Sequence, residues 1–313
     1  MGKAVGYLRL MRPVNCLMMG FAVIVGAVIS KQSFEDIFFS NLVYGFITGF
    51  TLAAASMIIN DFCDKDIDAI NEPSRPIPSG LIKPEEALVF ASVLTAIGFV
   101  AAFLTNTANA LVTSLCFMTA IISWTVSVAY ATVGKRTGLL GNFLVSACVA
   151  IPFIYGSLAV TSTVELNVLI LASMAFLSNT GREITKGIVD AQGDRIRNVQ
   201  TLAVRYGKKT AASAATLFYL FAVLLSPLPW FLNRVSIWFL PLVAITDFGL
   251  VASSVSLLKN YSRENARKVK RMVLLWFMTG LLAFILGIIS KPVIFDHVRV
   301  LSHTLLQSLL SSY

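Results

Sequence analysis

Nine runs of mainly apolar residues, each close to the length of a membrane-spanning helix, follow one another along the chain. They cover residues 14–30, 38–59, 87–105, 109–130, 140–160, 164–178, 211–232, 237–258 and 272–290. Crossing the hydrocarbon core takes roughly 20 apolar residues of helix, and backbone groups in lipid must be hydrogen-bonded within their own segment. With 57% hydrophobic and 13% charged residues, the chain is too apolar for a soluble domain. The pattern predicts an all-α integral membrane protein with nine transmembrane helices, the sixth continuing as a helix into the polar stretch that follows it.

Lysine and arginine residues fall almost entirely on one side of this topology. If the N-terminus is cytoplasmic, 21 of the 25 basic residues lie in cytoplasmic segments, and the other four are Lys31, Arg234, Lys291 and Arg299. Such an asymmetry follows the positive-inside rule. We therefore expect a multi-pass protein of the cell membrane with a cytoplasmic N-terminus. The net charge of +9 then marks a basic face that contacts anionic membrane lipid, and a nucleic-acid partner is not expected.

The two ends of the chain frame a single predicted domain over residues 1–290. The first apolar run is too long for a signal peptide and follows Arg9 and Arg12, so we expect an uncleaved first helix. Residues 291–313 place their apolar side chains on one helical face, which predicts an amphipathic tail in the outer interface. The four cysteines show no CxxC spacing, so neither a metal site nor a disulfide framework is indicated.

Negative charge is concentrated in two of the three long cytoplasmic connections, 60–86 and 179–210, the third being 259–271. The first contains Asn60, Asp61, Asp64 and Asp68. On a helix continuing from the second span, three of these residues would share a face, and like charges so placed repel. Carboxylate oxygens in this number suit Mg²⁺, which commonly bridges carboxylates to phosphates. The alternative is a solvated helix end, but the helix dipole disfavours acidic residues at a C-terminal end. The cluster therefore predicts a magnesium site.

A second acidic cluster follows the sixth span, where Lys186, Asp190 and Asp194 are again spaced four residues apart. Taken alone, this spacing is equally common on solvated helices. A shift of 126 residues superimposes the two clusters in the pairs Asn60 with Lys186, Asp64 with Asp190, and Asp68 with Asp194. This correspondence indicates a diverged internal repeat of four helices. Two facing carboxylate sets can hold a pair of metal ions around a diphosphate.

Basic residues on the same membrane face complete a diphosphate site: Arg75, Lys135, Arg182 and Lys186. Arginine binds phosphate oxygens bidentately and lysine acts as a point charge. The alternative for each is a positive-inside anchor, and that interpretation is preferred for the run from Lys259 to Arg271. The two histidines, His297 and His303, lie in the tail on the opposite side, so histidine catalysis is excluded from the basic face.

A membrane transporter built from repeats is an alternative class, because such proteins also place carboxylates inside the membrane. Transporter sites lie near the midplane, where this chain has only Asp247, in the eighth span. Asp247 is interpreted either as lining the substrate cavity or as hydrogen-bonding a neighbouring helix, and the sequence does not separate the two.

The stretch Asn60-Asp61-x-x-Asp64-x-x-x-Asp68, followed by Arg75-Pro76-x-Pro78-Ser79-Gly80, resembles the signature of the UbiA superfamily of intramembrane prenyltransferases. The Asp190-x-x-x-Asp194 motif and the nine predicted helices extend the resemblance over nearly the whole chain. Segments such as Arg12-Pro13-x-Asn15 and Arg182-Glu183-x-x-Lys186 are most similar to the archaeal digeranylgeranylglyceryl phosphate synthases. Gly187 and Val189 stand where that branch usually carries acidic residues, so the second motif is poorer in carboxylates.

This resemblance implies a Mg²⁺-dependent transfer of a geranylgeranyl group from a polyprenyl diphosphate donor, geranylgeranyl diphosphate. The acceptor would be the hydroxyl of a prenylated glycerol phosphate, geranylgeranylglyceryl phosphate, in archaeal ether-lipid synthesis, with pyrophosphate released on the cytoplasmic side. The metal ligands would be Asn60, Asp61, Asp64, Asp68, Asp190 and Asp194. Four of these, Asp64, Asp68, Asp190 and Asp194, would be the catalytic residues. Within the superfamily, an aromatic acceptor of the quinone, tocopherol or haem pathways is the alternative.

Overall fold

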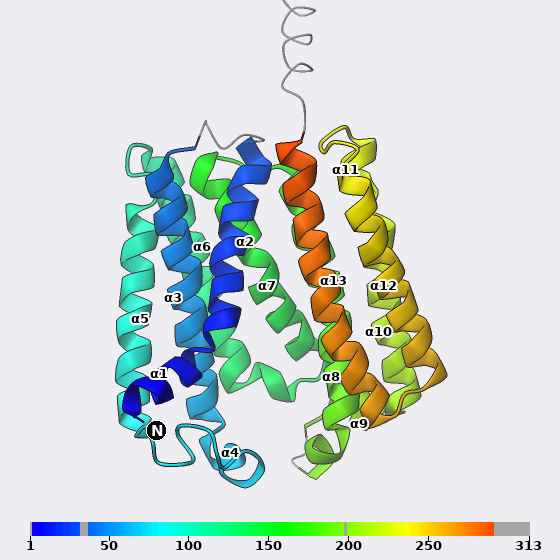
Figure 1. Cartoon of the computed structure of the whole chain (residues 1–313). Coiled ribbons are helices and arrows are strands. Elements are labelled where there is room, and N and C mark those ends of the chain that lie inside the picture. Colours follow the sequence, from blue (N-terminus) through cyan, green and yellow to red (C-terminus); the bar gives the residue numbers. More distant parts are fainter. Residues whose placement is uncertain (1, 32–36, 197–198, 291–313) are drawn as a thin grey trace, which may run out of the picture.

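The computed structural model describes residues 2–31, 37–196 and 199–290, and every regular element among them is a helix. Figure 1 shows a bundle of long helices. Three short helices lie at one end of it: α1 (Lys3–Met11), α4 (Lys65–Asn71) and α9 (Leu202–Arg205). We call this end the motif end; α11 (Leu228–Phe231) lies at the opposite end. The predicted amphipathic tail, residues 291–313, lies outside the described residues.

Eight helical segments of the described chain are long and apolar enough to cross a membrane. They are α2 (Pro13–Lys31), α3 (Phe39–Cys63), α5 (Pro84–Leu104), α6 (Ala110–Thr132), α7 (Leu139–Val160), Gly207–Phe231 with α10 (Gly207–Leu225) and α11, α12 (Phe239–Lys259), and α13 (Arg263–Ile289). The remaining long helix, α8 (Leu166–Ile196), holds the predicted sixth span and continues beyond it, as expected. The charged second half of α8 explains why this helix is not among the eight apolar segments. The chain is thus an all-helical, multi-pass membrane protein.

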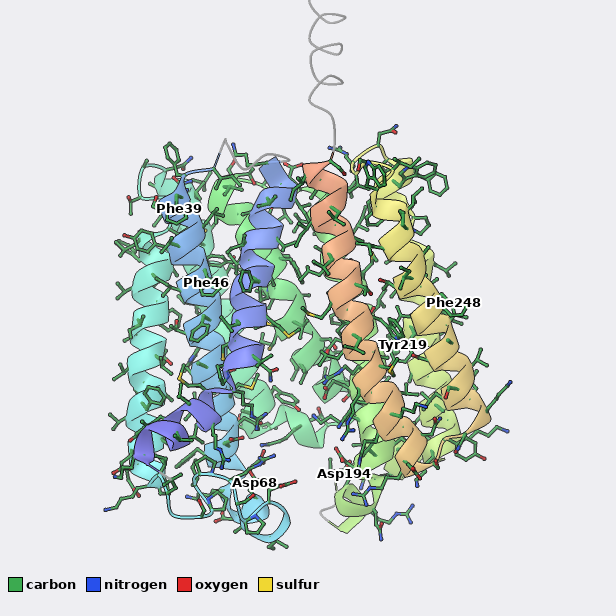
Figure 2. All side chains as sticks on the ribbon, in the orientation of Figure 1. Phe39, Phe46, Asp68, Asp194, Tyr219 and Phe248 are labelled. Atoms are coloured by element: carbon green, nitrogen blue, oxygen red, sulfur yellow. The ribbon has the colours of Figure 1, made fainter. Side chains whose placement is uncertain are left out.

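The outer surface of the bundle carries large apolar side chains. Phe39 and Phe248 are 78% and 76% exposed, and Figure 2 shows both at the periphery of the helices. Contiguous exposed apolar surface marks a face that meets lipid or a partner rather than water. This surface therefore agrees with the membrane assignment made from the apolar runs.

The first and second halves of the chain meet where α2 packs against α7. A Cβ added to Gly26 would lie 2.1 Å from the Phe153 carbonyl oxygen, and one added to Gly156 would lie 2.0 Å from the Val23 carbonyl oxygen. Small residues let membrane helices approach closely enough for backbone contact. This contact holds α2, which begins directly after Arg12, against α7.

The first acidic motif does not lie on one continuous helix, contrary to the prediction. Helix α3 ends at Cys63 and α4 begins at Lys65, with Asp64 between them. Backbone hydrogen bonds from Asp64 to Asn60 (3.0 Å) and from Asp68 to Asp64 (2.7 Å) keep the four-residue spacing through the junction. The break places Asp68 in the first turn of α4, where the helix dipole favours negative charge.

Two of the long polar connections are largely helical, the first of them as predicted for the continuation of the sixth span. Residues 179–196 belong to α8, and α13 begins at Arg263 inside the expected connection 259–271, capped by the Ser262 hydroxyl, which accepts from the Asn265 N–H. Helix α1 precedes the first span and was not predicted. Charge excludes a segment from the hydrocarbon core but not from a helix, because Lys, Arg and Glu are good helix formers.

Candidate active site

Asp61 and Asp68 of the first motif are paired with arginines from other parts of the chain. Arg12, at the junction of α1 and α2, donates to Asp61 at 2.5 Å. Arg75 donates to Asp68 at 2.5 Å and lies 3.5 Å from Asp61. The two aspartates are only 5% and 6% exposed. Burial raises the pKa of Asp68, and the neighbouring Arg75 guanidinium opposes that shift. The arginines are therefore what allow these buried carboxylates to stay charged.

Asp64 is tied to the turn between α6 and α7. Lys135, in the short 3₁₀ helix η1 (Gly134–Arg136), donates to Asp64 at 2.6 Å and to the Asn60 side-chain oxygen at 3.5 Å. The Asn60 amide nitrogen donates to Asp64 at 3.2 Å. The first motif thus joins the end of α3, the start of α4 and η1 in one polar cluster.

The loop that carries Arg75 is anchored by more than its prolines. The Arg75 carbonyl accepts from the Ser79 N–H at 3.0 Å, and the Pro76 carbonyl accepts from the Ile82 N–H at 3.0 Å. Ile77 and Ile82 are buried in the same hydrophobic cluster as α1 and α3. The guanidinium is therefore positioned by a folded loop with its own apolar anchors.

The second cluster is built around Glu183 on α8, which is 8% exposed. Arg182 and Lys186 both contact its carboxylate, at 3.3 Å and 3.0 Å. Asp190, one turn beyond Lys186 on α8, lies within electrostatic range of Lys186 and of Lys270 on α13. Five charged residues therefore meet on facing sides of two helices.

Both acidic motifs lie at the motif end of the bundle. Figure 2 shows Asp68 below α3 and Asp194 near the end of α8, across the gap between the two halves. Between the residues of the second motif, Val189 is 4% exposed and Gly187 faces the Thr201 side chain. Acidic side chains at positions 187 and 189 would thus enter packed surroundings in this chain.

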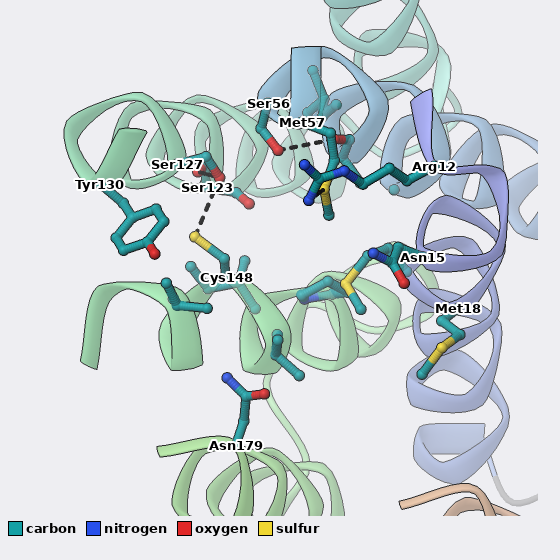
Figure 3. A pocket seen from close by; sticks show the side chains of 18 of the residues that line it. Arg12, Asn15, Met18, Ser56, Met57, Ser123, Ser127, Tyr130, Cys148 and Asn179 are labelled. Atoms are coloured by element: carbon teal, nitrogen blue, oxygen red, sulfur yellow. Dashed lines mark hydrogen bonds between the residues drawn. The ribbon is translucent and has the colours of Figure 1, made fainter. Parts of the chain in front are cut away.

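A pocket of about 450 Å³ opens between the two clusters. Helices α2, α3, α6, α7, α8 and α13 line it, and Figure 3 shows Tyr130 of α6, Asn179 of α8 and Arg12, from the junction of α1 and α2, around it. Its charged part is lined by side chains near the motif end, and its deeper part is mainly apolar, with Val23 and Leu52. Such a shape suits a ligand with an anionic head and an apolar tail.

Tyr130 of α6 links the two clusters across this pocket. It lies within electrostatic range of Asp64 in the first cluster and of Glu183 and Lys186 in the second. Segments separated by more than a hundred residues therefore face one shared space.

Not all predicted site residues take the predicted arrangement. Asn60, Arg182 and Lys186 line the pocket, while the remaining first-motif residues form the ion-paired cluster beside it. Among residues 2–31, 37–196 and 199–290, no group of three or more His, Cys, Asp or Glu side chains is close enough to hold a metal ion. The acidic side chains of the first motif are engaged with basic partners instead.

Comparison with known proteins identifies the family of this chain. The sequence profile of the UbiA prenyltransferase family matches residues 19–279. The chain belongs to the UbiA prenyltransferase family. The digeranylgeranylglyceryl phosphate synthase of Methanosarcina mazei is 37% identical to this UbiA enzyme over 294 residues, covering 90% of this chain and 98% of that protein. The synthase of Methanocaldococcus jannaschii is 36% identical, covering 93% and 98%.

Solved structures show the same UbiA fold. A structure of a digeranylgeranylglyceryl phosphate synthase has a TM-score of 0.76 at 35% identity and covers 93% of this chain and 100% of that chain. A UbiA homolog from Archaeoglobus fulgidus, bound to GPP and Mg²⁺, has a TM-score of 0.60 at 17% identity and covers 89% and 99%. The latter shares the fold alone. The protein is therefore a membrane prenyltransferase.

The polar residues of the UbiA pocket that were missed as site residues include Arg12, Tyr130, Glu183 and Lys270. Glu183 carries a local signal, since it stands between two cations at positions i−1 and i+3. Tyr130 lies in an apolar run and gives no signal. The anchor interpretation of the run 259–271 is wrong for Lys270, because helix α13 turns this one side chain into the pocket.

Asp247 does not line the pocket. Its carboxylate accepts a hydrogen bond from the Ser226 hydroxyl at 2.5 Å, which joins α12 to the end of α10. Of the two roles considered for Asp247, the structure therefore shows the hydrogen bond between neighbouring helices.

Proposed function

We propose that this enzyme transfers a geranylgeranyl group from geranylgeranyl diphosphate to the free hydroxyl of geranylgeranylglyceryl phosphate, releasing pyrophosphate in archaeal ether-lipid synthesis. The observation that carries the proposal is a single pocket with charged clusters from both halves of the chain at one end and an apolar interior. Relatives that are 36–37% identical over almost their whole length are digeranylgeranylglyceryl phosphate synthases.

Mg²⁺ is the cofactor in this proposal, held by Asn60, Asp61, Asp64, Asp68, Asp190 and Asp194. These side chains offer only oxygen ligands, which Mg²⁺ prefers. In the first motif, three carboxylates are matched by three basic groups, on Arg12, Arg75 and Lys135. A magnesium diphosphate brings a cation for the carboxylates and an anion for the basic groups. Its binding would exchange ion pairs without leaving a buried charge unpaired, so the donor set fits the metal.

The diphosphate would be bound by Arg75, Lys135 and Lys186. Bound Mg²⁺ supplies Lewis-acid stabilisation of the leaving group. The basic side chains add fixed positive charge where negative charge develops on the departing pyrophosphate. Arg182 was predicted for the same role. It lies eight residues from Asp190 along α8, roughly 12 Å deeper in the bundle at the rise of an α-helix.

The apolar interior would hold the prenyl tail and exclude water from the reacting carbon. Met18, Leu52 and Val149 line this part of the pocket from three helices. Exclusion of water prevents hydrolysis of an electron-poor allylic carbon. A carboxylate of the first motif would accept the proton of the acceptor hydroxyl, since general-base catalysis requires a group beside the reacting oxygen.

The proposed topology has nine spans, with α8 as the sixth, a cytoplasmic N-terminus and the pocket opening on the cytoplasmic side of the cell membrane. A shift of 126 residues brings α2 onto α7, α3 onto α8, α5 onto α10 and α6 onto α12, with bounds that differ by at most seven residues. Neighbouring helices pack in the same order in both sets, since α3 contacts α5 as α8 contacts α10. This agreement supports the proposed internal repeat.

A reconstituted assay tests the function. Purified protein with Mg²⁺, geranylgeranyl diphosphate and geranylgeranylglyceryl phosphate should form the diether phosphate and pyrophosphate. Excess EDTA should abolish product formation, and added Mg²⁺ should restore it. The variants Asp64→Asn and Asp190→Asn should each lose at least about 100-fold in kcat/KM, because each removes charge that stabilises the transition state.

Asp66→Asn is the matched control, because Asp66 is an exposed neighbour on α4 and makes no ion pair to a described residue. It should retain wild-type turnover. Transfer to an aromatic acid, with none to the glycerol phosphate, would contradict the proposed acceptor. Wild-type turnover in both Asp64→Asn and Asp190→Asn would contradict the proposed metal site.

A further inference from the structure

The second polar cluster carries surplus positive charge, unlike the first. Arg182, Lys186 and Lys270 face the carboxylates of Glu183 and Asp190, so one positive charge is unmatched. In the first cluster, each of three cations has its own carboxylate. A balanced cluster accepts an anion only together with a metal ion, whereas a cluster with surplus positive charge attracts an anion directly.

Two groups in this cluster have unused capacity to donate hydrogen bonds. The Arg182 Nε atom is buried and has no hydrogen-bond partner among the described residues, although its guanidinium also contacts Glu183. Lys270 makes no ion pair to any residue that the structure describes, and it lies among Asp190, Lys186 and Arg182. A buried, unpaired guanidinium nitrogen is costly unless a ligand satisfies it.

The chemistry of the acceptor calls for a cation close to the reacting carbon. In a glycerol phosphate, the free hydroxyl is within two carbons of the carbon that bears the phosphate. When that hydroxyl attacks the allylic carbon, the acceptor phosphate must therefore lie close to the reacting centre. It cannot occupy the donor site at the motif end, because the diphosphate is bound there. Arg182 and Lys270 line the same pocket, on the inner side of Asp190 along α8 and on the facing helix α13.

We infer that Arg182 and Lys270 bind the phosphate monoester of the acceptor lipid, in a subsite that needs no metal. The inference rests on the proposed function and adds to it a division of the pocket between two anions. The donor diphosphate takes the aspartate motifs with Arg75, Lys135 and Lys186, and the acceptor phosphate takes Arg182 of α8 and Lys270 of α13. A phosphate monoester carries about 1.5 to 2 negative charges at neutral pH, so it would more than offset the one unmatched positive charge of this cluster.

Equilibrium binding in EDTA tests the subsite apart from catalysis. The ligands are geranylgeranylglyceryl phosphate and the same lipid without its phosphate, added to the full-length protein in detergent. The wild type should bind the phosphorylated lipid roughly 10- to 100-fold more tightly, as expected for charge-assisted hydrogen bonds. Lys270→Gln and Arg182→Gln should each reduce this ratio about tenfold or more, and Lys270→Arg should retain most of it.

Lys268→Gln is the matched control, because Lys268 lies two residues away on α13, is exposed and does not line the pocket. In turnover assays with Mg²⁺, Lys270→Gln should raise the acceptor KM roughly 10-fold or more and leave the donor KM within about twofold. A raised donor KM in Lys270→Gln, or an active variant that still binds the phosphorylated lipid with the wild-type preference, would overturn this inference and leave the proposed function standing. A wild type that neither binds nor converts the phosphorylated acceptor would overturn the proposed function as well.

Discussion

Single buried carboxylates hold the polar part of this pocket together. Glu183 contacts both Arg182 and Lys186, and Asp61 lies between Arg12 and Arg75. Removing one member of a buried ion pair costs more than the pair itself contributes, because the remaining charge is left desolvated. These two carboxylates therefore act on stability as well as on the charge of the site.

The Glu183→Gln variant should be less stable than the wild type. Loss of a buried pair costs about 3–5 kcal/mol, but Lys186 is 42% exposed, so solvent screening reduces the expected loss to roughly 1–3 kcal/mol. A lower Tm in detergent would report this loss. Glu264→Gln, at an exposed position on α13, should leave Tm unchanged. Equal Tm values for the two variants would contradict the structural role assigned to Glu183.

At the scale of elements, the pocket depends on how closely α2 and α7 approach. Both helices line the pocket, and their backbones are in contact at Gly26 and Gly156. A helix pair held by small residues tolerates no added methyl group without moving apart. Separation of these helices would widen the pocket and shift Arg12 away from Asp61.

Gly156→Ala should therefore destabilise the protein by about 1–3 kcal/mol, the usual cost of overpacking. Gly193→Ala on α8 is the control, because a Cβ at Gly193 meets no atom within 4 Å. That control should be neutral or slightly more stable, since alanine favours helix over glycine. Thermal unfolding in detergent compares the two. A Gly156→Ala protein as stable as the wild type would show that the helices have room to separate.

At the scale of the whole molecule, the two acidic motifs reach the same end because each lies at the C-terminal end of a helix, and the two helices run in the same direction. Helix α3 leads to Asp61 and Asp64, and α8 leads to Asp190 and Asp194. Figure 1 shows α4 and α9 together at this end. The proposed topology assigns this end to the cytoplasm.

Cys63 offers a test of that orientation, because it is the exposed member of the four cysteines and lies at the end of α3. A membrane-impermeant maleimide should label Cys63 in inside-out vesicles and not in intact cells. Cys63→Ser should remove the labelling, which separates it from reaction at the half-buried Cys148. Labelling of Cys63 in intact cells would reverse the proposed topology.

The helical membrane class and the positions of the two acidic motifs along the chain can be predicted from sequence alone. Apolar run length and residue spacing are local properties, so they are readable without a structure. The predicted runs 14–30, 109–130 and 140–160 lie within two residues of the bounds of α2, α6 and α7. Local reading failed at Asp64, where a helix break replaces the continuous helix that the four-residue spacing suggested.

Which charges meet depends on how the helices pack. Lys135 reaches Asp64 across 71 positions and Arg12 reaches Asp61 across 49, and Lys270 enters the pocket from a run that resembles a membrane anchor. Basic residues on one membrane face all satisfy the positive-inside rule alike, so sequence cannot separate an anchor from a ligand-binding group. Helix packing makes that distinction, because it sets which side chain is buried beside a carboxylate and which remains in water.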